Sequence, residues 1–245
     1  ISVKKEEVAV KNMMRILEAV FALNRENGFE TMSLRDLSRK SGLSMGALYC
    51  YFPGKEELRS MILRQGVAYT RDVILEQTGA CPNPVKRLEV AIETHLYLTE
   101  VLRPWFYFAY MEASSLSRRE KQRAMEDELT TEQIFLDILN EGVESGDLHC
   151  PDVELVAGLI KAVLQDWYLK RWKYVSRKIT VEAYAEKLTS TGAPINAKDR
   201  FVGIVRQKTE SRPPRPNLQV AGTTSDAITV RFTHPEPGTF DKIRL

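Results

Sequence analysis

Residues 41–58 read SGLSMGALYCYFPGKEEL, and this stretch decides how the N-terminal part of the chain folds. It holds glycines at three positions, two tyrosines and a proline, whereas the flanking sequence repeats apolar residues at helical spacing. Gly42 ends one helix, Ser44 can cap the next, and Pro53 stops that helix because proline has no N–H to donate. The stretch therefore predicts a short helix between two turns.

The residues before this stretch predict two further helices. Apolar residues recur at helical spacing from Val10 to Phe21, and Gly28 marks the end of that first helix. Ser33 and Asp36 form a capping-box pair, which opens a second helix that runs to Gly42. A second helix, a short turn and a short third helix are the pattern of a helix-turn-helix, whose third helix enters the major groove of DNA.

The spacing within the third helix separates a buried face from an exposed one. Leu48 and Phe52 lie four residues apart and are expected to pack inward, with Leu37 and Leu43. The opposite face carries small residues, which let a helix approach base edges closely. The residues expected to read bases are Met45, Gly46, Ala47, Tyr49 and Cys50. The residues expected to hold phosphates are Ser33, Arg35, Ser44, Tyr49, Tyr51 and Lys55.

Residues 28–58, GFETMSLRDLSRKSGLSMGALYCYFPGKEEL, resemble the tetracycline-repressor (TetR) family of bacterial transcription regulators. The match runs in order through the Ser-x-Arg-Asp of the second helix, the Gly-x-Ser turn, Gly-Ala-Leu-Tyr and Phe-x-x-Lys-Glu-x-Leu. The resemblance implies that Arg35, Tyr49, Tyr51 and Lys55 contact DNA. It also implies that Cys50 occupies a variable position that sets operator preference. Packing is the alternative role for the two tyrosines.

The rest of the chain predicts an all-α fold with a short β-like tail. A helix-turn-helix domain is expected at residues 1–54, a helical effector-binding and dimerisation domain at 55–190, and an extension at 191–245. Helices are expected near residues 55–78, 84–102, 104–115, 118–145, 152–175 and 180–190. The extension, with the strand pattern AITVRF, resembles part of a fibronectin type III domain. Too few strands are present to close a sandwich, so we expect a truncated, fused or artefactual segment, either disordered or paired with another chain.

Two segments are candidates for contact with an effector. Residues 103–116 are rich in aromatic side chains, and the family resemblance implies that Trp105, Phe106 and Tyr110 help to wall a pocket, with core packing as the alternative. The basic aromatic run DWYLKRWKYVSRK at 166–178 contains Trp167 and Arg171. It resembles a subset of the family that responds to fatty acyl-CoA thioesters, and a solvated basic face is the alternative.

Composition restricts the classes of protein that remain. The net charge is only +2, so no global basic field indicates a nucleic acid, and three widely spaced cysteines predict neither a disulfide framework nor a zinc site. No signal peptide or membrane span is evident, so we expect a cytoplasmic protein without a membrane partner. No phosphate-binding loop, nucleophile elbow or H-E-x-x-H helix is present, which argues against an enzyme, and we expect no cofactor and no metal.

The function expected from these features is that of a ligand-responsive transcriptional regulator, with repression favoured over activation. The resemblance implies a homodimer, formed by the last two helices at 152–175 and 180–190, that binds a pseudo-palindromic operator in double-stranded DNA. A small apolar or amphipathic effector, with acyl-CoA as one candidate, would release it. The alternative is a helical ligand-binding or interaction protein without specific DNA binding.

Overall fold

Local capping signals set the bounds of the first helices. Ser33 Oγ accepts a hydrogen bond from Asp36 N at 3.1 Å, and Ser33 N donates to Asp36 Oδ2 at 3.2 Å, which confirms the predicted capping box. Gly42 follows with a φ of +66°, a conformation that favours glycine, and Ser44 caps the next helix. The structure is a computed structural model, and it describes residues 3–113, 116, 118–189, 206–207, 217–224, 227–233 and 243–244.

The N-terminal helices pack around the apolar side that the sequence predicts. Leu37, Leu43, Leu48 and Phe52 are all buried, so the inward face expected for the third helix is confirmed. Burial of these side chains fixes which face of the short helix is left outside. The helices are α1 (Val3–Asn27), α2 (Leu34–Ser41) and α3 (Met45–Tyr49).

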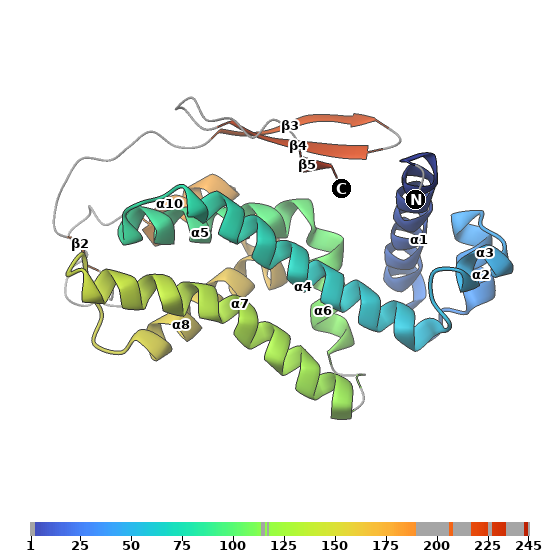
Figure 1. Ribbon diagram of the computed structural model, residues 1–245, viewed down its shortest axis with the longest axis horizontal. Helices are drawn as coiled ribbons and strands as arrows, with labels where there is room; N and C mark the ends of the chain where they lie inside the picture. Colours follow the sequence, from blue (N-terminus) through green and yellow to red (C-terminus); the bar gives the residue numbers. More distant parts are fainter. Residues whose placement is uncertain are drawn as a thin grey trace. The chain divides into compact units, whose positions relative to one another are not determined.

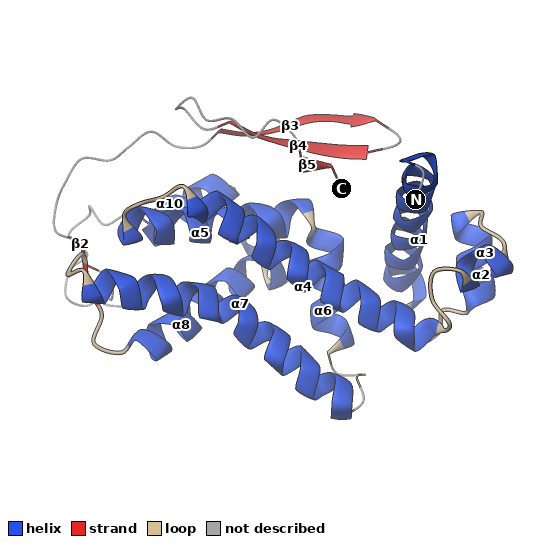
Figure 2. Ribbon diagram, viewed as in Figure 1, coloured by secondary structure: helices blue, strands red, loops and turns tan. Residues whose placement is uncertain are grey.

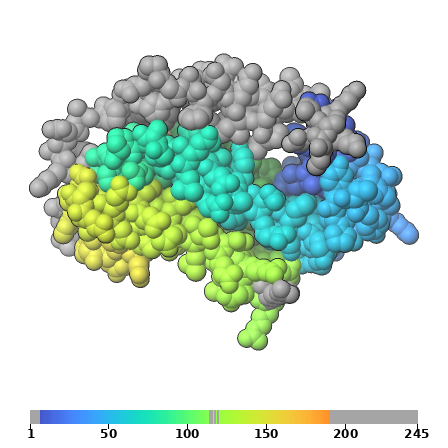
Figure 3. All heavy atoms as spheres, viewed as in Figure 1, coloured from blue at the N-terminus to red at the C-terminus, as the bar shows by residue number. Residues whose placement is uncertain are grey.

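The remaining helices form a bundle around α5, as Figures 1 and 2 show. Helix α5 contacts α4, α6, α7, α8 and α10, and most of its side chains are buried. Helices α4 and α7 lie side by side, and their side chains cover much of the face seen in Figure 3. The helices are α4 (Lys55–Gly79), α5 (Pro84–Val101), α6 (Arg103–Glu112), α7 (Arg118–Glu144), α8 (Val153–Leu169), α9 (Arg171–Ser176) and α10 (Val181–Thr189).

One predicted helix was wrong in its extent. The segment 152–175, expected as a single helix, is interrupted at Lys170, whose φ of −113° and ψ of 27° leave the helical region. Lys173 Nζ turns back to Asp166 Oδ2 at 2.8 Å, and Arg171 reaches Glu100 on α5. These contacts hold the chain in its new direction after the break.

Short strands complete the described structure. Strands β1 (Leu148–His149) and β2 (Arg206–Gln207) pair antiparallel. In the tail, β3 (Asn217–Thr224), β4 (Ala227–Thr233) and β5 (Ile243–Arg244) form an antiparallel sheet in that order.

The predicted strand over AITVRF is confirmed, and the described residues are otherwise almost entirely helical, as the predicted fold class requires. The likeness to fibronectin type III stays a prediction, since much of 191–245 lies outside the described residues.

The chain divides into two compact units, residues 13–208 and residues 1–12 with 209–245. The first unit contains α2 to α10 together with most of α1, and the second contains the start of α1 and the three-stranded sheet. No helix in the described part of the chain is long and apolar enough to cross a membrane.

Candidate nucleic-acid interface

Helix α3 presents an outer face of small and uncharged residues. Tyr49 is 53% exposed, and Gly46 and Cys50 are exposed beside it, while Met45 and Ala47 are half-buried. The Cys50 thiol donates to the Gly46 carbonyl at 3.3 Å, so it lies along the helix. Four of the five residues predicted to read bases therefore belong to this short helix, and Cys50 lies at its C-cap. Such a face can approach base edges and thymine methyl groups.

The predicted phosphate contacts border this face from α2 and from the helix ends. Arg35 is exposed on α2, and the hydroxyls of Ser33 and Ser44 lie at the first turns of α2 and α3. Hydrogen bonds from the Ser33 side chain and backbone lower the pKa of Asp36, which keeps this capping carboxylate ionised. Tyr51 is half-buried. Exposed cations and helix N-termini are the groups that position a protein on the DNA backbone.

Lys55, the remaining predicted phosphate contact, is occupied within the protein. Its ammonium donates to the Glu30 carbonyl at 2.6 Å and lies 5.1 Å from the ring centre of Phe29. The side chain is only 21% exposed. Lys55 therefore fastens the connection between α1 and α2 to the start of α4. An ammonium has three donors, so Lys55 can donate to a phosphate while it keeps its hydrogen bond to Glu30. The phosphate contact stays a prediction.

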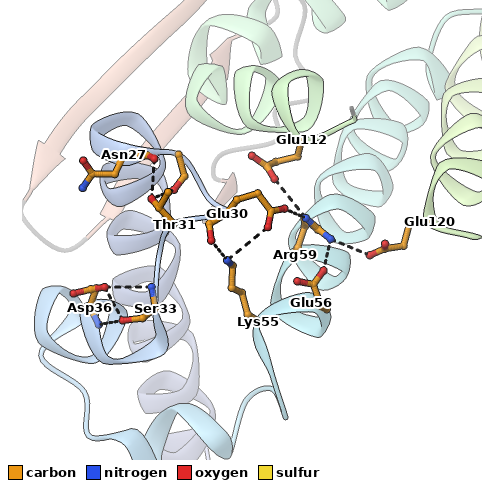
Figure 4. Close-up of polar contacts among 11 residues, drawn as sticks. Asn27, Glu30, Thr31, Ser33, Asp36, Lys55, Glu56, Arg59, Glu112 and Glu120 are labelled. Atoms are coloured by element: carbon orange, nitrogen blue, oxygen red, sulfur yellow. Dashed lines mark hydrogen bonds and ion pairs between the residues drawn. The ribbon is translucent and has the colours of Figure 1, made fainter. Parts of the chain in front are cut away.

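A buried arginine joins the helix-turn-helix to the bundle, as Figure 4 shows. The Arg59 side chain on α4 is 4% exposed and forms ion pairs with four glutamates. Glu30, before α2, lies 2.6 Å away, whereas Glu112 at the end of α6 lies at 3.7 Å and Glu120 on α7 at 3.6 Å. The fourth partner is Glu56. Arg59 thus connects four segments through one guanidinium group.

Helix α6 is also locked to α4 by an aromatic side chain. Trp105 Nε1 donates to the Ile62 carbonyl at 2.9 Å, and its indole ring lies directly against Gly66. Phe106 packs between Trp105 and Tyr168, at ring distances of 4.8 and 5.1 Å. Of the predicted effector residues on this helix, Trp105 and Phe106 are therefore buried together.

Tyr110, the third predicted effector residue of α6, lies on the exposed side of that helix. Because its side chain is exposed, only Trp105 and Phe106 of the three belong to the buried aromatic contacts that join α6 to α4 and α8.

The other two predicted effector residues belong to a separate group. Trp167 stacks on Tyr174 at 5.0 Å and donates to Glu100 at 2.8 Å, and Arg171 pairs with the same carboxylate at 2.7 Å. Burial alone would raise the pKa of Glu100, but the hydrogen bonds from Arg171 and Trp167 lower it below its usual value. The Arg171 charge is therefore already paired. Its predicted contact with an effector stays a prediction.

Comparison with known families assigns this arrangement. Residues 16–61 match the model described as bacterial regulatory proteins, tetR family, and residues 81–187 match that of the tetracyclin repressor-like C-terminal domain. Together the two matches cover more than half of the chain and include both the helix-turn-helix and the bundle. The chain belongs to the tetR family. It is a DNA-binding transcriptional regulator, as the sequence predicts.

Individual relatives and solved structures are similar over about 70% or more of this chain. The HTH-type transcriptional repressor KstR2 of Mycobacterium tuberculosis is 28% identical over 191 residues, which cover 70% of this chain and 86% of KstR2. FadR of Bacillus subtilis, solved with stearoyl-CoA, superposes with a TM-score of 0.63 at 20% identity, over 74% of this chain and 99% of FadR. AibR, solved with isovaleryl coenzyme A and operator DNA, superposes at 0.62 and 18% identity, over 73% and 96%. The superpositions on FadR and AibR show a likeness of fold alone.

Sequence reasoning missed the residues that connect the helix-turn-helix to the helical bundle of this tetR-family protein. Glu56 precedes Arg59 by one helical turn, which is a local signal for that pair alone. Glu30, Glu112 and Glu120 come from distant parts of the sequence, so no spacing rule predicts that they meet. Within the described residues, no cluster of His, Cys, Asp and Glu side chains is arranged to hold a metal ion.

Proposed function

We propose that this protein is a homodimeric repressor that binds a pseudo-palindromic operator through α3 and is released by an acyl-CoA thioester. The observation that carries the proposal is the pair of connections between α4 and α6. The ion pair of Arg59 with Glu112 and the hydrogen bond from Trp105 to Ile62 join α4 to α6. They link the exposed face of α3, through the start of α4, to the core of the bundle. A ligand bound in the bundle can then change the position of α3.

The proposed dimer rests on apolar side chains that the single chain leaves in water. Leu155 on α8 and Val175 on α9 are exposed, and Trp172 on α9 is 73% exposed. A second copy can cover such residues by two-fold pairing around α8 and α10. Two recognition helices about 34 to 36 Å apart then face successive major grooves on one side of the duplex.

The proposed effector class draws on the solved relatives together with the interior of the bundle. FadR and AibR, whose folds superpose on this chain, were solved with stearoyl-CoA and isovaleryl coenzyme A. The buried Trp105 and Phe106 on α6 and the half-buried Tyr168 on α8 provide apolar surface that suits an acyl group. An effector that prefers the conformation with misaligned recognition helices weakens DNA binding by its difference in affinity, typically about 1 to 3 kcal/mol.

The test is a selection of randomised duplex DNA on the purified full-length protein, with and without stearoyl-CoA or isovaleryl-CoA. The expected result is a palindromic motif whose enrichment falls when one of the thioesters is added. A motif that neither thioester affects would retain the regulator and overturn the effector class.

The alternative of a helical interaction protein predicts a different outcome of the same selection. No motif at all, from a protein shown to be folded and dimeric, would favour that alternative. Free coenzyme A serves as the control, because it carries the phosphates without the acyl group.

A further inference from the structure

Two buried polar atoms in the helical bundle have no partner within the described part of the chain. They are Nδ1 of His95 on α5 and Oγ1 of Thr70 on α4, and each residue is only 2% exposed. Buried polar atoms are nearly always hydrogen-bonded, and leaving one unsatisfied destabilises the folded protein. A ligand group that completes these bonds would remove that destabilisation.

Each of the two residues is connected with the aromatic pair Trp105 and Phe106 of α6. The His95 ring lies 5.6 Å from Phe106, which in turn lies 4.8 Å from Trp105. The Trp105 indole covers Gly66, and Thr70 follows Gly66 by one helical turn, so both residues share one face of α4. Helices α4 and α5 also pack against each other. His95 is thus tied to this aromatic pair by its contact with Phe106, and Thr70 by its place one turn beyond Gly66.

The surroundings of His95 combine ring faces with one buried cation. Phe135 lies 6.4 Å from the imidazole, and Tyr168 packs on Phe106 from α8. Lys161, also on α8, is buried, donates to Thr131 Oγ1 at 2.6 Å and forms an ion pair with Glu128 at 3.3 Å. The surroundings are thus apolar on several sides and able to form hydrogen bonds at a few points.

The imidazole is neutral in this setting. Burial, and secondarily the positive charge of Lys161, hold the pKa of His95 well below its usual value. One ring nitrogen of a neutral imidazole donates and the other accepts. The Thr70 hydroxyl can do both. Each group suits an uncharged oxygen better than a carboxylate, whose charge would have to be buried here beside a lysine that is already paired with Glu128.

We propose that His95 and Thr70 each offer a hydrogen bond to oxygen on the acyl part of the effector, so that the protein prefers hydroxyacyl or ketoacyl thioesters over saturated ones. This inference rests on the proposed function, in which the effector is a thioester that enters the bundle. A saturated acyl chain packed against these residues would leave both polar atoms unpaired, whereas a hydroxyl or keto group would pair with the one that it reaches. Sites built around such hydrogen bonds discriminate strongly against analogues that lack the group.

The first test needs no ligand. Thr70→Val removes a hydroxyl that has no partner, so it should raise the melting temperature of the full-length protein by about 2 to 4 °C. The matched control is Thr78→Val on the same helix, because the buried Thr78 hydroxyl donates to Ile74 O at 2.8 Å and its loss should lower the melting temperature. If both variants lose stability equally, the Thr70 hydroxyl is paired within the protein and the inference is wrong.

The second test compares thioesters of one chain length. Binding of octanoyl-CoA is measured by calorimetry beside the 3-hydroxy, 3-oxo and 8-hydroxy forms. At least one oxygenated form should bind about tenfold more tightly than octanoyl-CoA, and the difference should vanish in Thr70→Val and His95→Leu. His95→Gln keeps a donor and an acceptor, so it should retain part of the difference in affinity between the oxygenated thioesters and octanoyl-CoA.

The outcomes separate this inference from the proposed function. Equal binding of all four thioesters, with an operator motif that is lost on their addition, would overturn the oxygen contact and leave the acyl-CoA repressor intact. Binding of none of them, with a motif still selected from DNA, would overturn the effector class and the oxygen contact together.

Discussion

The indole ring of Trp105 covers Gly66 so closely that a β-carbon at residue 66 would lie 1.9 Å from Trp105 Cε2. Only glycine allows α4 and α6 to meet at this distance. The same ring donates its N–H to the Ile62 carbonyl, so packing and hydrogen bonding fix one contact point between the helices.

Gly66→Ala should therefore displace Trp105 and destabilise the protein by about 1 to 3 kcal/mol, the usual cost of overpacking. Thermal unfolding measures the effect. Gly79→Ala, at the end of the same helix, is the control, because a β-carbon there meets nothing within 4 Å and should be neutral or stabilising. Equal melting of Gly66→Ala and the wild type would contradict the packing described.

Arg59→Met should destabilise the protein by about 3 to 5 kcal/mol, because it leaves the buried carboxylate of Glu112 without this cation. Urea denaturation monitored by circular dichroism measures the loss. Arg39→Met provides the comparison, since the Arg39 side chain is 80% exposed and water screens its pair with Asp36, so its loss should leave the stability nearly unchanged. Similar midpoints for the two variants would show that the Arg59 cluster contributes little.

Arg35→Ala should weaken operator binding without loss of stability, because the side chain is exposed on α2 beside the recognition face. If Arg35 holds a phosphate, the slope of log affinity against log salt should fall by about 1, equally for all sequences. Titrations by fluorescence anisotropy at several salt concentrations give this slope. Arg71→Ala, on the distant half of α4, should change neither quantity, and an unchanged slope in Arg35→Ala would exclude the phosphate contact.

Stability should fall as the pH drops below about 6.5, the usual pKa of histidine. The folded-state pKa of His95 is depressed by burial and then by Lys161, so the unfolded state binds the proton first as the pH falls. The loss reaches at most about 1.4 kcal/mol per pH unit and should be absent in His95→Leu. Urea midpoints at pH 7, 6 and 5 test this, with His149→Gln at an exposed site as the control expected to follow the wild type.

The helix-turn-helix could be predicted in detail because its signals are local. The Ser33 capping box, the left-handed Gly42 and the inward side of α3 all depend on neighbours within a few residues. The break at Lys170 could not be predicted, since Arg171 turns toward Glu100, 71 residues earlier in the chain. The same holds for His95, whose surroundings come from α6, α7 and α8.

The site residues also divide into those set by local sequence signals and those set by contacts between distant segments. The exposed side of α3 follows from helical spacing, whereas the contact of Lys55 with Glu30 depends on how a connecting segment folds back over α4. Sequence spacing places Lys55 at the start of a helix but does not reveal which oxygen its ammonium meets.

The contact between Trp105 and Gly66 lies near the middle of α4, a single helix of 25 residues. Helix α4 can therefore tilt about this contact. The segment from Gly66 to Lys55 is about 17 Å long at 1.5 Å per residue, so a tilt of about 5° moves the start of α4 by about 1.5 Å. A displacement of that size exceeds the distance range of a hydrogen bond, and a small rearrangement around α6 would be enough to separate α3 from the base edges that it is proposed to read.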